Sequence, residues 1–365
     1  MSHPIDLPDT PEVRAQLDAA AAVTFEHFGL DPKQVAVWED GYRSAKDDAH
    51  SFEWWYFDMQ FDDGSTIVTT FNTKPSTAPD GPMKPSVLLI RRDAKGNSQR
   101  AQLAADPSAF SSATDTCDVH IGPNWVRGDL TNYTLHVEGD GCVIDLQMAR
   151  GAPSWRPGGG VTFFDKANTE FLAWVAPVPY GTVTGTVTDA EGTRTVNGTG
   201  YHDHNWGNHL MGSGLDHWYW GRAHIDDFSL IFVMLTTKGA FGIGSINIPT
   251  LFLAKGETLL TDDLVPLHLT TSGEVSGPGH QTYPTDLLWT WQHGADSVRF
   301  HITNPEMIEA LDMTEGEPAW RRALTHLTKH AMYYDFNADI TLDVDVAGVK
   351  ASVTGRALYE KMMFR

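Results

Sequence analysis

The segment Gly198-Thr-Gly-Tyr-His-Asp-His-Asn-Trp-Gly207, followed closely by Asp216-His-Trp-Tyr-Trp-Gly-Arg-Ala-His224, concentrates unusual chemistry in a short stretch of this chain. Residues 198–224 include five histidines, three tryptophans and two tyrosines. Solvated loops rarely hold so many large aromatic side chains, and ordinary cores rarely hold so many histidines. An apolar cavity with a few convergent polar groups uses this mixture. The segment therefore predicts a ligand site, with the rest of the chain as its scaffold.

A second stretch, Phe52-Glu-Trp-Trp-Tyr-Phe-Asp58, has the same aromatic and acidic character. Alternate residues of a strand share a face, so a strand here would carry two sets of side chains on opposite faces. The first set is Phe52, Trp54, Tyr56 and Asp58, and the second is Glu53, Trp55 and Phe57. A strand over His217–His224 would group four further side chains on one face, namely Trp218, Trp220, Arg222 and His224.

Two interpretations of these residues are open. In the first, the tryptophans pack two sheets together and Glu53 forms a buried ion pair with Arg222, because a buried carboxylate must be paired or become protonated. In the second, the indoles wall an apolar pocket in which an acid points at a carbon–carbon double bond. Indole faces stabilise a nearby cation, and a desolvated carboxylic acid can give up a proton.

The second interpretation assigns roles to individual side chains. The catalytic candidates, which could act as acids, donate hydrogen bonds or orient the substrate, are Asp203, His204, Glu53 and Tyr56. The substrate-binding candidates, which could form the walls of the pocket, are Trp54, Trp55, Trp206, Trp218, Trp220, Arg222 and His224.

The pair His202 and His204 also resembles the His-x-His element of metal-dependent oxygenases of the cupin kind. Such sites need a further acidic ligand a few residues later, and here the chain continues Asn205-Trp-Gly-Asn-His209. The Gly-x-Ser-x-Gly motif of serine hydrolases is absent, and Gly242-Ile-Gly244 lacks the strand–helix context of a dinucleotide-binding loop. We therefore expect neither a metal ion nor an organic cofactor.

The remainder of the sequence predicts an all-β protein with an N-terminal helix. Apolar residues at helical spacing over 11–28, after Thr10-Pro11 and before Gly29, predict that helix. From Ser51 onward, short alternating runs separated by turn residues predict strands and hairpins.

These strands are too many for one closed barrel or sandwich, so we expect two consecutive β domains, 1–210 and 211–365. Two short helices are also expected, at 305–311 and 318–330.

Composition limits the kinds of partner. The net charge is 26 − 47 = −21, which disfavours binding to nucleic acid or to anionic lipid. The two cysteines, Cys117 and Cys142, have no zinc-site spacing, and a pairing between them stays open. The first residues do not look like a signal peptide and no apolar run is long enough to span a membrane, so we expect a cytoplasmic protein. Nothing in the sequence indicates the oligomeric state.

Taken together, the motifs at 52–58, 200–207 and 218–222 resemble those of the carotenoid 1,2-hydratase (hydroxyneurosporene synthase) superfamily of lipocalin-like proteins. That superfamily also includes fungal Diels–Alderases that build decalins. The order and spacing of the motifs extend the resemblance over most of the chain. It implies two lipocalin-like β domains, a ligand cavity near their junction, and redox-neutral chemistry without metal or organic cofactor.

The resemblance also carries particular residues. The His-x-Trp element of the hydratases falls on His204 and Trp206. Their proton donor is an aspartate in a Tyr-x-Asp element on the following strand, where this chain has Phe232 and Met234 instead. This difference disfavours simple hydration and favours cyclisation.

The sequence thus predicts a cofactor-independent cyclase or hydratase that acts on a hydrophobic polyene or terpenoid-like metabolite. Two alternatives are open. A pericyclase would need no proton transfer, because it would hold the substrate in a folded conformation and donate a hydrogen bond to a polarised carbonyl. A lipocalin-like carrier would bind such a ligand and perform no chemistry.

Overall fold

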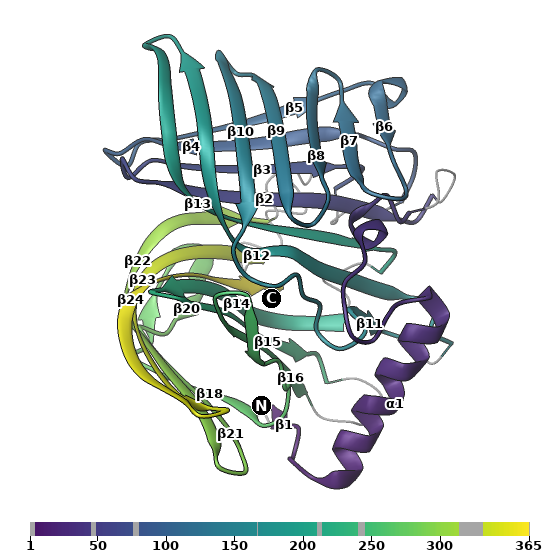
Figure 1. The fold of residues 1–365 in the computed structure, drawn as a ribbon, viewed down its shortest axis with the longest axis vertical. Coiled ribbons are helices and arrows are strands. Elements are labelled where there is room, and N and C mark those ends of the chain that lie inside the picture. The colour runs from purple at the N-terminus through teal and green to yellow at the C-terminus, as the bar shows by residue number, and fades with distance from the viewer. Residues whose placement is uncertain are drawn as a thin grey trace. The chain divides into compact units, whose positions relative to one another are not determined.

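We describe the chain from a computed structural model over residues 4–44, 49–75, 80–165, 167–209, 214–239, 245–313 and 331–364. Strands make up most of these residues, and helix α1 (Pro11–Phe28) lies near the N-terminus (Figure 1). The expected all-β class with two lipocalin-like domains and a leading helix is confirmed. The left-handed backbone of Gly29 (φ 66°) ends the helix, as glycine at this position usually does.

The chain divides into two compact units. The N-terminal unit is Asp18–Met211, and the C-terminal unit is Gly212–Arg365 together with Met1–Leu17. The first 17 residues therefore group with the C-terminal unit, and not with the N-terminal domain expected over residues 1–210. One cause is visible in the pairing of the short strand Ile5–Asp6 with Ile246 and Asn247.

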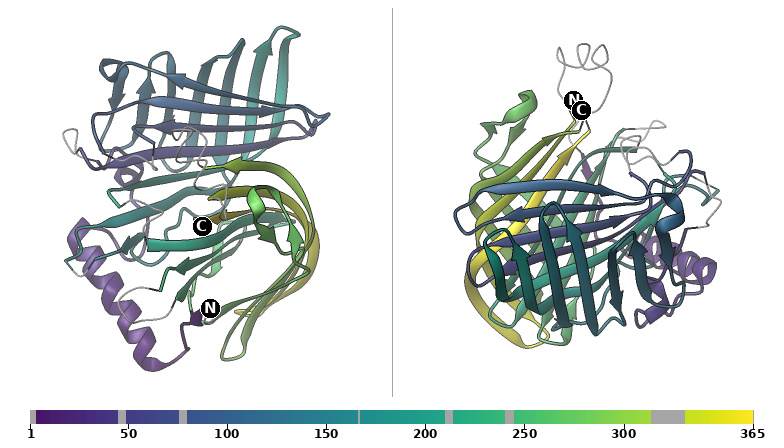
Figure 2. Two further views of the ribbon diagram at one scale, coloured as in Figure 1. Left: turned by 180° about the vertical axis from the view of Figure 1, so that it is seen from behind. Right: turned by 90° about the horizontal axis from the view of Figure 1, so that it is seen from above.

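Within the described residues, the N-terminal unit contains a 12-stranded sheet in the order β5-β4-β3-β2-β13-β12-β10-β9-β8-β7-β6, with β11 paired to β12. Strands β6–β10 cross β2–β5 on the other side of the core (Figures 1 and 2). The strands are β2 (Phe52–Phe61), β3 (Thr66–Asn72), β4 (Ser86–Arg92), β5 (Ser98–Ala104), β6 (Phe110–Ser112), β7 (Cys117–Ile121), β8 (Asn124–Gly128), β9 (Asn132–Gly139), β10 (Cys142–Arg150), β11 (Val161–Phe163), β12 (Phe171–Asp189) and β13 (Gly192–Gly207). Two 3-10 helices, η1 (Val37–Asp40) and η2 (Pro107–Ala109), belong to the same unit.

The core of this unit follows the alternation of its strands. On β2, the side chains of Trp55, Phe57, Met59 and Phe61 point into the core. Each fully buried side chain of this size stabilises the fold by about 1.5–3 kcal/mol relative to exposure. The set with Glu53, Trp55 and Phe57 is therefore the inner face of β2.

The C-terminal unit contains a 10-stranded sheet in the order β1-β16-β15-β14-β24-β23-β22-β21-β18, with β17 paired to β16, among the residues described. Its strands are β1 (Ile5–Asp6), β14 (Leu215–Ile225), β15 (Phe228–Thr237), β16 (Ile246–Lys255), β17 (Thr258–Thr261), β18 (Leu267–Ser272), β21 (Asp286–His293), β22 (Asp296–Asp312), β23 (Met332–Val346) and β24 (Val349–Met363). A small ribbon of β19 (Val275–Ser276) and β20 (Thr282–Tyr283) and the 3-10 helix η3 (Pro278–His280) accompany it.

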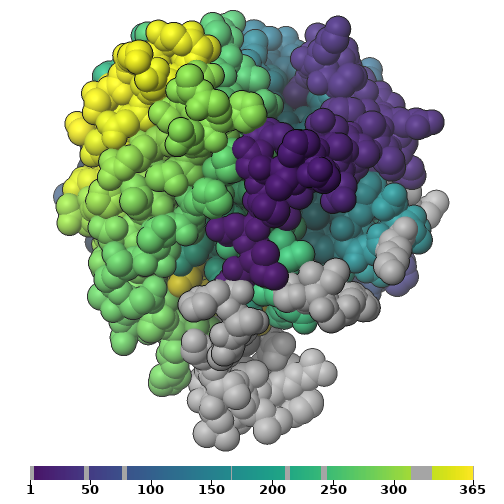
Figure 3. Space-filling model, turned by 90° about the horizontal axis from the view of Figure 1, so that it is seen from below, coloured from purple at the N-terminus to yellow at the C-terminus, as the bar shows by residue number. Residues whose placement is uncertain are grey.

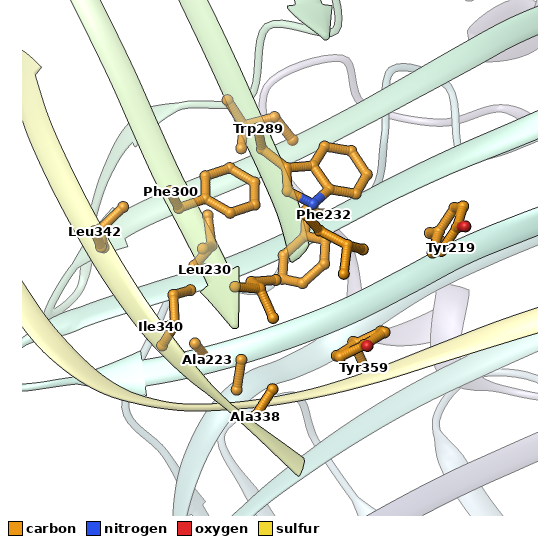
Figure 4. Close-up of a cluster of buried hydrophobic side chains, with 14 of the residues drawn as sticks. Tyr219, Ala223, Leu230, Phe232, Trp289, Phe300, Ala338, Ile340, Leu342 and Tyr359 are labelled. Carbon is orange, nitrogen blue, oxygen red and sulfur yellow. The ribbon is translucent and has the colours of Figure 1, made fainter. Parts of the chain in front are cut away.

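Strictly alternating burial along β23 supplies a large part of this unit's core. Figure 4 shows aromatic rings from three further strands, Phe232, Trp289 and Phe300, meeting within it. The ring centroids of Trp289 and Phe300 are 5.5 Å apart in a stacked arrangement, and Phe232 lies 5.1 Å from Trp289.

Several finer expectations have clear outcomes. Residues 305–311, expected as a helix, continue strand β22, because pairing with β23 prevails over local preference. The second expected helix, 318–330, lies outside the described residues. Cys117 and Cys142 are both buried free thiols.

Helix α1 lies at the surface of the molecule, and Figure 3 shows the N-terminal residues in purple. No helix in the described ranges is both long enough and apolar enough to cross a membrane.

Candidate functional site

The two aromatic motifs of the N-terminal unit are neighbours, because β2 and β13 pair in antiparallel register. His204 lies opposite Trp55 and Asp203 lies opposite Tyr56. Paired residues share a face and adjacent ones do not. The four catalytic candidates therefore separate into His204 with Glu53 on the inner face and Asp203 with Tyr56 on the outer face.

On the inner face, His204 and Glu53 are in direct contact and fully buried. His204 Nε2 lies 2.8 Å from Glu53 Oε1, and His204 Nδ1 lies 3.1 Å from the backbone oxygen of Glu39. The amides of Arg43 and Ser44 donate to the two carboxylate oxygens of Glu53 at 2.8 and 2.7 Å. Glu53 thus finds its partners within its own unit, and the ion pair with Arg222 is not needed to explain its burial.

His202, two residues before His204 on β13, has a similar arrangement. Its Nδ1 lies 2.9 Å from the backbone oxygen of Tyr56, and its Nε2 lies 3.1 Å from Asp40 Oδ2. The hydroxyl of Tyr133 donates to the same Asp40 oxygen at 2.5 Å. Burial, together with the nearby Asp40 charge, raises the pKa of Tyr133 well above its ordinary value, so Tyr133 remains a donor.

Each of the two imidazoles therefore lies between a backbone carbonyl and a carboxyl group. A carbonyl oxygen can only accept, so the Nδ1 atom of both rings must carry a hydrogen. Each remaining Nε2–carboxyl contact then holds one shared proton, as imidazolium with carboxylate or as imidazole with carboxylic acid. Trp55 stacks on His204 with ring centroids 4.6 Å apart and an interplanar angle of 11°.

Sequence reasoning missed the acidic partners Glu39 and Asp40 and the cation Arg156. Arg156 Nη1 donates to both carboxylate oxygens of Glu39, at 2.9 and 2.8 Å, and all three residues are buried. Burial raises the pKa of Glu39 and lowers that of Arg156, and their mutual attraction opposes both shifts. The one available signal was the acidic pair within the apolar run 35–42; nothing in the sequence links it to residue 156 or to residues 202–204.

Asp40, Cys117 and His202 form a group in the described chain whose ligand atoms lie within 4.8 Å of one another, as a metal site would require. Two of the three groups already contact each other, because His202 Nε2 lies 3.1 Å from Asp40 Oδ2, the oxygen that also accepts from Tyr133. Burial, with the adjacent Asp40, raises the pKa of the Cys117 thiol well above its ordinary value and so disfavours the thiolate that a metal binds. The expectation of no metal stays a prediction.

On the outer face, Asp203 is buried and accepts from three side chains. Tyr201 Oη donates to Asp203 Oδ2 at 2.8 Å, Trp174 Nε1 donates to the same oxygen at 3.2 Å, and Asn205 Nδ2 donates to Oδ1 at 2.8 Å. Three donors suit an ionised carboxylate, which accepts hydrogen bonds and cannot donate them. This arrangement fits Asp203 as a base or as a charge that stabilises a cation better than as a proton donor.

Aromatic rings surround Asp203 on this face. Tyr56 and Tyr201 lie edge to face at 6.2 Å, and Trp155 and Trp174 do so at 5.4 Å. Trp54, which is half-buried, is on the same face of β2 as Tyr56. Of the other wall candidates in this unit, Trp55 and Trp206 both lie on the inner face, against His204.

In the C-terminal unit, Trp218, Trp220, Arg222 and His224 share one face of β14, as the alternation predicted. Tyr219, Ala223 and Ile225, on the opposite face of β14, belong to the core of the unit. Burial lowers the pKa of His224, so this imidazole is neutral near pH 7.

The strand expected to carry the hydratase acid is β15. Its residues Phe232 and Met234 belong to the core of the unit, so they point away from the face that carries Trp218 and Trp220. A carboxyl group that sequence reasoning missed lies on that face instead. Glu360 of β24 pairs in register with Trp220, and Trp218 Nε1 donates to its Oε1 at 2.7 Å.

Burial raises the pKa of Glu360, and hydrogen bonds from Trp218 and Tyr333 oppose part of the rise. A carboxyl group with a raised pKa beside indole rings has the character of a general acid. Its position 142 residues after Trp218 explains why no local motif identified it.

Fold and site together define a class: a two-unit, lipocalin-like β protein with carboxyl groups set among indoles and phenols. Solved structures with the same fold include CghA bound to Sch210972 (TM-score 0.63, 13% identity, covering 91% of this chain and 97% of CghA). They also include an AttH-like protein from Nitrosomonas europaea (TM-score 0.60, 18% identity, covering 92% and 99%) and kievitone hydratase from Nectria haematococca (TM-score 0.53, 16% identity, covering 91% and 94%). No protein-family model and no curated protein sequence matches the chain.

These similarities show that the lipocalin-like fold expected from the sequence motifs is correct. The catalytic and substrate-binding assignments, and the location of the ligand pocket, stay predictions.

Proposed function

We propose that this protein is a cofactor-independent enzyme that protonates a hydrophobic, unsaturated metabolite and thereby cyclises or hydrates it. The observation that carries the proposal is Glu360, a carboxyl group with a raised pKa, bound by the indole of Trp218 and adjacent in register to Trp220. An aromatic, partly desolvated setting favours both the neutral acid before proton transfer and the cation after it.

Cyclisation needs no co-reactant, because the proton that starts the reaction is returned at its end. Glu360 gives its proton to one carbon of a double bond, and the π electrons of that bond form the new carbon–hydrogen bond. A second double bond of the same molecule attacks the resulting cation and forms the ring. Loss of a proton from a neighbouring carbon to the Glu360 carboxylate restores the acid, and the product is an isomer of the substrate.

Hydration differs in the step that follows protonation, where water attacks the cation instead of a second double bond, and the resulting oxonium ion returns a proton to the Glu360 carboxylate. The name of kievitone hydratase, which shares the fold, supports this second outcome. The nature of the substrate, whether terpenoid or polyketide, is an expectation from the sequence resemblance.

Replacement of Glu360 by glutamine tests the proposal. Glu360→Gln keeps the shape and can still accept from Trp218, but it cannot transfer a proton, so turnover of a linear isoprenoid alkene should fall by about 100-fold or more. The matched control is Glu306→Gln, because Glu306 lies in the same unit with its side chain 73% exposed. Equal turnover in wild type and Glu360→Gln, with both correctly folded by circular dichroism, would refute the role of this acid.

A further inference from the structure

The N-terminal unit contains a cavity of about 150 Å³ that none of the preceding chemistry uses. It lies beside α1 and β12, and its walls include the aromatic rings of Phe28, Trp38, Phe171 and Trp206. A cavity of this size accommodates roughly one benzene ring, whereas pockets for larger metabolites measure about 300–1,000 Å³. The cavity is therefore too small for a polyene and fits a small flat molecule.

The charges at its wall favour an anion. Arg43, Arg156 and Glu39 all line the cavity. Glu39 is bound by Arg156 through two contacts below 3 Å, so these two charges compensate each other. Arg43 bonds through its guanidinium to the backbone oxygens of Gly41 and Thr114. The carboxyl groups that attract its charge, those of Glu53, Glu39 and Asp40, are in contact with His204, Arg156 and His202, respectively. One positive charge is therefore left among the lining residues.

A further feature matches a planar carboxylate. The Arg43 guanidinium lies 5.0 Å from the ring centre of Trp38, which places the cation next to a flat aromatic wall.

From this combination we infer that the cavity binds a small, flat monocarboxylate of about the size of benzoate. The ring would lie between the aromatic walls, and the carboxylate would accept from Arg43. Such a ligand would be distinct from the larger substrate of the proposed reaction, and its binding requires nothing from Glu360.

Titration of the full-length protein with benzoate, followed by tryptophan fluorescence and calorimetry, tests this inference, with benzamide as the neutral probe of the same shape. We expect saturable benzoate binding that Arg43→Met weakens by about 10-fold or more, since a charge-assisted hydrogen bond is lost. Benzamide should bind more weakly than benzoate, and Arg43→Met should leave its affinity unchanged.

The matched control is Arg127→Met. Arg127 lies 5.0 Å from the ring centre of Trp125 in the same unit, so it reproduces the stacking of Arg43 on Trp38 away from the cavity. A second variant, Val161→Phe, fills the cavity without changing its charge and should abolish binding even if Arg43→Met folds poorly. Absence of saturable benzoate binding, equal affinity for benzamide, or equal loss in Arg127→Met would overturn the inference.

Discussion

His202 and His204 show how much of this chain's chemistry is built into its fold. Each imidazole is buried between a backbone carbonyl and a carboxyl group. Both of its nitrogen atoms are therefore engaged in hydrogen bonds within the protein. Both rings also stack on aromatic side chains, Phe57 for His202 and Trp55 for His204. A group with all its hydrogen-bonding positions occupied in this way suits a structural role that fixes β13 in place.

Removal of the Glu53 carboxyl group should therefore destabilise the fold. In Glu53→Gln the amide NH₂ would face a donor, either the amide of Arg43 or Ser44 or the His204 ring, and His204 would lose the carboxyl group with which it shares a proton. We expect the free energy of unfolding to fall by about 3–5 kcal/mol, the usual cost of breaking a buried ion pair. Urea denaturation followed by circular dichroism measures this change.

Glu138→Gln is the control for this measurement, because Glu138 is exposed on β9 of the same unit. Its substitution should change stability by no more than about 0.5 kcal/mol. If the two variants were equally stable, the inner cluster would not support the fold, and a catalytic role for His204 and Glu53 would become the better explanation.

At the scale of single residues, the sequence predicted which residues of one strand share a face, but it did not predict their partners from other strands. The alternation of β2 was sufficient to group Glu53 with Trp55, and the same rule applied to β13 separates Asp203 from His204. The partners Asp40, Arg156 and Glu360 were not predictable, because they come from distant parts of the chain and a single sequence does not show which strands pair.

At the scale of elements, the long hairpin of β12 and β13 is the framework on which both faces of the candidate site depend. Its full extent over Phe171–Gly207 was not predictable from the sequence, because irregularities in the register on either side of Val178 interrupt the alternating pattern. Glycines allow β13 to approach its neighbours closely. A Cβ atom added at Gly198 would lie 2.0 Å from the backbone oxygen of Gln60 on β2.

Gly198→Ala should therefore weaken the pairing of β13 with β2. Backbone atoms cannot move aside as the end of a flexible side chain can, so we expect a loss of about 1–3 kcal/mol in the free energy of unfolding. Asn197→Ala, at an exposed position next to it, should stay within about 0.5 kcal/mol of wild type. Equal melting temperatures for the two variants would show that the strands tolerate the extra methyl group.

At the scale of the whole molecule, the two units contribute different chemistry. The N-terminal unit holds Asp203 as an acceptor among phenol, indole and amide donors, and the C-terminal unit holds Glu360 with a raised pKa beside Trp218. The resemblance to the hydratases predicts an acid on β15, but the chain has Met234 at that position. This difference favoured cyclisation over hydration. With Glu360 on the indole-bearing face of the C-terminal unit, the lack of an acid at Met234 no longer argues against hydration.

Three functions remain to be distinguished, namely ionic chemistry, pericyclic chemistry and simple binding. The origin of one hydrogen atom in the product distinguishes them. The carboxyl proton of Glu360 exchanges with solvent, so reaction in deuterated water should place deuterium at the protonated carbon, as mass spectrometry and NMR of the product can measure. A pericyclase would give product without solvent deuterium on carbon, and a carrier would bind the polyene without forming product. Incubation of finished product with enzyme in deuterated water controls for later exchange. Product that forms without label would refute protonation by Glu360, and the hydroxyl groups around Asp203 would become the better candidates for orienting a pericyclic substrate.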